Sequence, residues 1–75
     1  MLTNGTIFIK EKTILFCIGN EIKPETKCKK LSINGRTYDS IGSSVSNSIS
    51  DVLSLGIVLQ GEIDIPDGLE VTIIE

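Results

Sequence analysis

The sequence predicts a small all-β domain, on the strength of three observations. Apolar residues recur with a two-residue period along much of the chain, which is the spacing of side chains on one face of a strand. An Asn-Gly pair at positions 34 and 35 lies between two such segments. The hydrophobic 40% of the chain is mostly Ile, Leu and Val with no alanine, which favours strands over helices. We expect one domain over residues 1–75, folded as a closed or nearly closed Greek-key β-barrel of about six strands, because closure protects the edges of so small a sheet.

Two strands and a tight turn are predicted near the N-terminus. Residues 6–10 and 13–18 both alternate with a period of two, and the polar residues 10–12 between them fit a hairpin connection. The apolar residues that share one side of these two segments are Ile7 and Ile9, then Ile14, Phe16 and Ile18.

A second hairpin is predicted around Asn34-Gly35. Pro24 cannot donate a ladder hydrogen bond, so it marks a turn that precedes this hairpin. Segments 27–33 and 36–41 flank the Asn-Gly pair, whose residues tolerate the positive φ of a type I′ turn. A two-residue turn pairs apolar with apolar and positive with negative side chains. The predicted pairs are Ile33 with Arg36, Leu31 with Tyr38, and Lys30 with Asp39.

The last third of the chain is expected to supply the central strand of the core. Residues 40–50 contain six serines and are predicted to form an irregular surface connection. Residues 52–59 then place Leu53, Leu55, Ile57 and Leu59 on one face. A turn at residues 66–68, Pro-Asp-Gly, leads into a closing strand over residues 69–74.

The charges are unevenly distributed along the chain. Residues 1–38 hold all seven Lys and Arg and three Glu (+7 − 3 = +4), whereas residues 39–75 hold seven acidic residues and no basic one, for a net charge of −3. This asymmetry predicts a basic face for RNA, the ribosome or an acidic partner protein. Ordinary solvated surface with cross-strand ion pairs is the alternative interpretation. The candidate binding residues are Lys27, Lys29, Lys30 and Arg36, with Lys10, Lys12 and Lys23 nearby.

Few residues could carry chemistry, so we expect a protein that is not an enzyme. Because the chain has no histidine, Ser-His-Asp and Cys-His catalysis are excluded. Cys17 and Cys28 flank a predicted turn and could form a redox pair or a disulfide, but two reduced side chains on or near the sheet surface are favoured. Glu62, Asp64 and Asp67 could bind calcium or magnesium, but their spacing departs from a calcium-binding loop and favours a solvated acidic turn. No cofactor and no metal are expected.

Neither a signal peptide nor a membrane span is expected. The first twelve residues lack a basic region followed by a long apolar run. The longest uncharged segments, 40–50 and 52–61, are too short or too rich in serine to cross a bilayer. We therefore expect a cytoplasmic protein with no membrane partner.

Two stretches, "KKLSINGRTYDSI" at 29–41 and "SDVLSLGIVLQGEIDIPDGLEV" at 50–71, resemble the second domain of translational GTPases, the β-barrel of elongation factor Tu and its relatives. The matching elements are Leu31 to Tyr38, Asp51, Leu55 to Leu59, Gly61, Asp64 and Gly68. The resemblance covers about residues 27 to 74 and implies a stand-alone barrel that docks on RNA, the ribosome or a partner protein. No G-x-x-x-x-G-K-[ST] motif occurs, so the chain cannot be a GTPase by itself.

Three hypotheses for function follow. The leading one is a non-enzymatic binding module that resembles the translation-factor barrel and presents its lysine-rich side to RNA, the ribosome or an acidic protein. The alternative is a structural or assembly protein that forms a homo-oligomer through exposed strand edges or exposed apolar residues such as Phe8, Leu15 and Val58. The third is a small enzyme or redox factor that uses Cys17 and Cys28.

Overall fold

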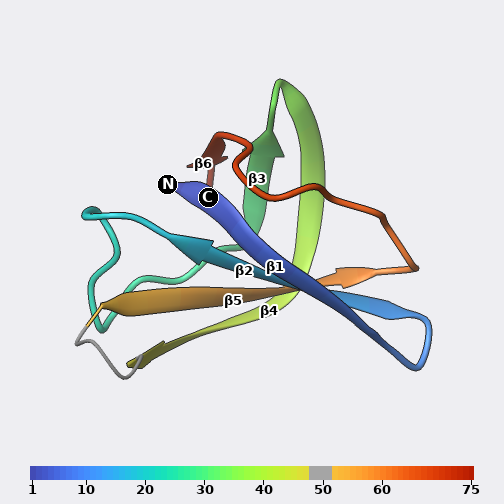
Figure 1. Ribbon diagram of the computed structural model, residues 1–75, viewed down its shortest axis with the longest axis horizontal. Helices are drawn as coiled ribbons and strands as arrows, with labels where there is room; N and C mark the ends of the chain where they lie inside the picture. Colours follow the sequence, from blue (N-terminus) through green and yellow to red (C-terminus); the bar gives the residue numbers. More distant parts are fainter. Residues whose placement is uncertain (48–51) are drawn as a thin grey trace.

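A computed structural model describes residues 1–47 and 52–75, and these residues form six antiparallel strands and no helix (Figure 1). The strands form one sheet in the order β1-β2-β5-β4-β3-β6. Their bounds are β1 Leu2–Ile9, β2 Lys12–Ile18, β3 Lys30–Ile33, β4 Arg36–Asn47, β5 Leu53–Gln60 and β6 Val71–Ile73. The all-β prediction is therefore confirmed. The described part of the chain also contains no helix that is long and apolar enough to span a membrane.

Both predicted hairpins are present. Ile9 pairs with Lys12, which leaves Lys10 and Glu11 as a two-residue turn in which both residues have positive φ, 48° and 64°. The second turn contains Asn34 and Gly35, also with positive φ. The register of β3 on β4 is the predicted one over all three predicted pairs.

Strand β4 extends well beyond its predicted end. The irregular connection predicted for residues 40–50 is wrong over residues 40–47, which pair with β5, while residues 48–51 lie outside the described residues. One bulge, at Ile41, interrupts the pairing, and the Ser40 hydroxyl stabilises it by donating to the Gly42 carbonyl oxygen (2.9 Å) and accepting from the Gly42 amide (3.1 Å). Pairing with a buried neighbour overrides the weak strand preference of serine. Figure 1 shows β4 as one long curved strand that reaches both β3 and β5.

The core lies between the inner faces of the strands. Leu55, Ile57 and Leu59 of β5 are at most 1% exposed, as predicted for the central strand. Leu15 pairs with Ile57 on this inner face and is fully buried, so the prediction that Leu15 is exposed is wrong. Both faces of β2 are apolar, and for this reason its two-residue period alone does not identify the inner face. On β2 the fully buried residues are Thr13, Leu15 and Cys17, and the outward residues Ile14, Phe16 and Ile18 are half-buried.

The two edges of the sheet meet at one place without closing it. Leu2 and Glu70 form an isolated antiparallel bridge, and the backbone amide of Val71 donates to the Met1 carbonyl oxygen at 2.8 Å. The Thr3 amide donates to the Leu69 carbonyl oxygen at 2.9 Å. No ladder between β1 and β6 occurs in the described residues, so the sheet is not closed.

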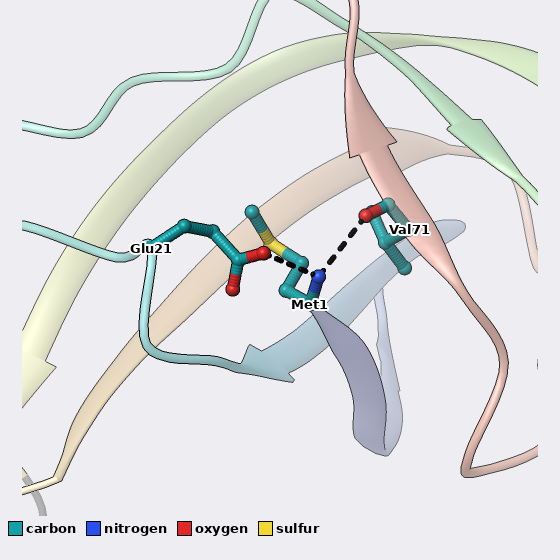
Figure 2. A network of polar contacts seen from close by, with 3 residues as sticks. All are labelled: Met1, Glu21 and Val71. Atoms are coloured by element: carbon teal, nitrogen blue, oxygen red, sulfur yellow. Dashed lines mark hydrogen bonds and ion pairs between the residues drawn. The ribbon is translucent and has the colours of Figure 1, made fainter.

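The N-terminal ammonium group stabilises this junction (Figure 2). It donates to the Glu21 carboxylate at 2.9 Å and to the Val71 carbonyl oxygen at 3.3 Å, and thus connects β1, the loop after β2, and β6. This is the one ion pair within 4.0 Å among residues 1–47 and 52–75. The hydrogen bond from the ammonium holds the pKa of the exposed Glu21 carboxyl below its ordinary value of 4.5.

The link between β5 and β6 runs across the open end of the sheet without pairing as a strand. Threonine side chains hold it instead: the buried Thr3 hydroxyl donates to the Pro66 carbonyl oxygen (2.7 Å) and accepts from the Leu69 amide (2.9 Å). The Thr6 hydroxyl donates to the Ile65 carbonyl oxygen at 3.0 Å. These contacts keep Ile65 in the core.

Candidate functional site

Two of the four candidate basic residues lie together. Lys27 and Lys29 line an open hollow of about 350 Å³ beside residues 40–43 of β4. The Ser40 amide donates to the Lys29 carbonyl oxygen (2.9 Å), and the Cys28 amide donates to the Ser43 hydroxyl oxygen (2.9 Å). The segment that carries these two lysines is therefore fixed against β4 by hydrogen bonds.

Lys30 and Arg36 point to opposite faces of the β3–β4 hairpin. Lys30 is paired with Asp39, whereas Arg36 is paired with the buried Ile33, and directly opposed residues of a ladder share a face. Arg36 lines a separate hollow together with Asp64. The structure thus places the four candidate residues on different parts of the surface, and Lys10 and Lys12 lie at a third place, the β1–β2 turn.

Both cysteines are free and buried, so the prediction that they lie on or near the surface is wrong. Cys17 pairs with Leu55 on the inner face of the sheet, and Cys28 packs in the same core. Burial, with a smaller contribution from the neighbouring Cys28, raises the pKa of the Cys17 thiol from 9.0 to about 11, and burial also raises the pKa of Cys28. Both groups are neutral thiols at neutral pH, and a thiol is a poor nucleophile.

The acidic residues of the last turn are likewise dispersed. The Asp67 carboxylate accepts the Gly5 amide at 2.8 Å, where a bulge in β1 leaves that amide without a ladder partner. Asp64 lies by the Arg36 hollow, and Glu62 is exposed. Over the described ranges, no group of three or more His, Cys, Asp or Glu side chains could hold a metal ion.

The most distinctive surface is the outer face of strands β1, β2, β5 and β4, which we call the outer face. The registers place fourteen residues on it, because paired residues share a face and neighbours alternate. Six are uncharged polar residues or glycines, Gly42, Ser44, Ser46, Ser54, Gly56 and Gln60. Seven are apolar, Leu2, Ile7, Ile9, Ile14, Phe16, Ile18 and Val58. Lys12, at the margin, is the one charged residue of the fourteen.

A hollow of about 420 Å³ lies at the centre of the outer face. Ile14, Phe16 and Val58 form its apolar wall, and its serine-rich side is formed by Gly42, Ser43, Ser44 and Ser46 of β4. Gly56 leaves the floor open: a Cβ there would lie 3.7 Å from the Phe16 ring and 3.7 Å from the Ser44 carbonyl oxygen. Gly56 pairs with both Phe16 and Ser44, and it has no side chain to occupy the space between them.

Sequence reasoning found the alternation of Ile14, Phe16 and Ile18 but assigned no surface to it. A usable signal was present in the partner strand, since Ser54 and Gly56 alternate with the buried leucines of β5 and mark its outward side. That side of β5 carries no charge. Recognising the outer face also required β4, whose serines were assigned to a connection.

Comparisons with known proteins assign no family. A scan against protein-family models found no match, and neither did a search of curated proteins or a search of solved structures. Fold and site together define an all-β domain whose outer sheet face carries a single charged residue, Lys12. The resemblance to translation-factor barrels stays a prediction.

Proposed function

We propose that this protein is a non-enzymatic binding module whose outer face docks a partner protein. The observation that carries the proposal is the near absence of charge on that face: one residue of fourteen, in a chain that is 23% charged. Depletion of charge with retention of apolar and small polar residues is typical of the centre of a protein interface. An outer sheet face that carries seven apolar residues is typical of an interaction site on a small domain.

A protein is favoured over RNA as the partner. Phosphate recognition requires several converging cations, and the outer face offers Lys12 alone. Lys27 and Lys29 lie beside a different, serine-lined hollow, and neither Phe8, Phe16 nor Tyr38 lines it as a platform for bases.

The resemblance leads us to propose a nearly closed Greek-key barrel related to the second domain of translational GTPases. The strand order β2-β5-β4-β3 supports a Greek key. Strands β3, β4 and β5 follow one another along the chain and lie side by side, and β2, which precedes them in the sequence, lies beside β5. The Leu2–Glu70 bridge supports near closure, since it brings the two edge strands together.

Site-specific photo-crosslinking in cells of the source organism tests the docking surface. A photoreactive amino acid replaces Ser44, an exposed residue beside the central hollow, and a matched control variant carries it at Thr72, an exposed residue of β6 away from the outer face. We expect a discrete protein adduct from position 44 and none from position 72. Adducts of equal yield from both positions, or an adduct with RNA from position 44, contradict the proposal.

A further inference from the structure

We infer that the occupant of the outer face is a second copy of this chain, packed face to face against the first. This inference rests on the proposed function and names the partner at that same surface. The charge pattern points to it: a symmetric pairing of two outer faces covers apolar and small polar residues on both sides, with Lys12 at the margin. Any partner with a charged surface would instead bury unpaired charge against Ile14, Phe16 and Val58.

The size of the outer face suits a small homodimer. Four strands spaced about 4.8 Å apart, each of seven or eight residues at about 3.3 Å per residue, give a footprint of roughly 480 Å² per copy. Two copies together cover about 950 Å², close to the roughly 1,000 Å² at which specific interfaces begin. Two sheets packed in this way lie about 10 Å apart, with their side chains interdigitated.

Edge-to-edge pairing of β1 is the competing geometry, and it uses one strand instead of four. Ile7, Phe8 and Ile9 are 46%, 47% and 47% exposed on this edge strand. Ile7 and Ile9 belong to the outer face as well, so they do not separate the two geometries. Phe8 is paired with the inward Thr13 and lies on the opposite side, so it reports on edge pairing alone.

Analytical ultracentrifugation over about 1 μM to about 1 mM protein, a range that brackets a micromolar dissociation constant, tests the inference. We expect the mass to rise from 8.1 kDa toward twice that value. Ser44→Lys places a charge beside the central hollow and raises the dissociation constant at least tenfold. Thr72→Lys, at an exposed residue of β6 away from the outer face, leaves the constant within twofold. Circular dichroism establishes that each variant is folded.

Three outcomes overturn the second-copy inference. A wild-type mass of 8.1 kDa at every concentration does so, as does a dimer that persists in Ser44→Lys. A dimer that Phe8→Lys dissociates and Ser44→Lys does not assigns the interface to the β1 edge instead. A crosslinked adduct from position 44 with a different protein overturns the second copy but leaves the proposed docking function intact, whereas the absence of any adduct overturns both.

Discussion

The Thr13 hydroxyl group donates a hydrogen bond to the carbonyl oxygen of Gly61 at 2.6 Å, across 48 residues of sequence. The Thr13 hydroxyl oxygen in turn accepts a hydrogen bond from the Ile63 amide at 2.8 Å. Thr13 is fully buried, so one side chain of β2 satisfies two backbone groups at the start of the link to β6. Thr3 does the same at the end of the link.

Thr13→Val is expected to lower the free energy of unfolding by about 2–4 kcal/mol, because it keeps the shape of the side chain and leaves two backbone groups without a partner. Urea denaturation monitored by circular dichroism measures the change. Thr37→Val, at an exposed position of β4, is the matched control and is expected to change stability by less than about 0.5 kcal/mol. A loss below about 1 kcal/mol in Thr13→Val would mean that water satisfies both groups.

The double substitution Lys10→Asn, Glu11→Gly is expected to raise the free energy of unfolding by about 1 kcal/mol. Both residues have positive φ, a conformation that is unfavourable for L-residues with long side chains. Asn-Gly is the preferred pair in such a turn. Thermal and urea unfolding measure the gain. Glu62→Gly, at an exposed link residue without positive φ, is the control and gives no gain. A double variant less stable than the wild type would show that this turn does not strain the hairpin.

Glu21→Gln is expected to destabilise the protein at neutral pH and to lose this effect in acid. The pKa of the folded Glu21 carboxyl lies below its ordinary value of 4.5, so its contribution to stability is present above that value and disappears as the pH falls through the folded pKa. Urea denaturation of both proteins at pH values from about 3 to about 7 measures the difference. Glu25→Gln, in the same loop, is the matched control. A constant difference at all pH values would indicate that the ion pair with Met1 does not form.

The free energy of unfolding is expected to fall as the pH rises above 9. The pKa of Cys17 is about 11 in the folded protein, compared with the ordinary value of 9.0. Between pH 9 and pH 11 the thiol therefore ionises in the unfolded state but not in the folded state, and this stabilises the unfolded state relative to the folded one. In Cys17→Ala the free energy of unfolding is expected to fall less steeply with pH than in the wild type. The difference between the slopes of the two proteins isolates the contribution of Cys17, because the other titrating groups are the same in both. Equal slopes would place Cys17 in contact with solvent.

Local chemistry made part of the fold predictable. Asn34 and Gly35 determine a two-residue turn, and the register of β3 on β4 follows by counting outward. The alternation of Leu53, Leu55, Ile57 and Leu59 with Ser54, Gly56 and Gln60 correctly predicted the buried face of β5. In both cases the information lies within a few residues.

The remainder depends on residues that are distant in sequence. The pairing of Ser44 with Gly56 makes a strand of a segment that reads as a loop, and no local pattern in β4 shows that pairing. The buried side of β2 is determined by its partner strand, so Leu15 and Cys17 were placed on the surface. The positions of the candidate residues Lys27 and Lys29 depend on the path of the chain from β2 to β3, and the sequence of this segment has no periodic pattern that predicts the path.

Strand β4 also determines how the molecule opens. Its first four residues pair with β3, and residues 40 and 42–47 pair with β5. Neither part of the sheet can therefore separate without exposing the backbone of the same strand. The part with β6 and the part with β1 are therefore coupled into one cooperative unit, rather than two segments that fray independently. Amide protons of Leu31 and Ile57, on either side of this strand, would then exchange with solvent through the same global event.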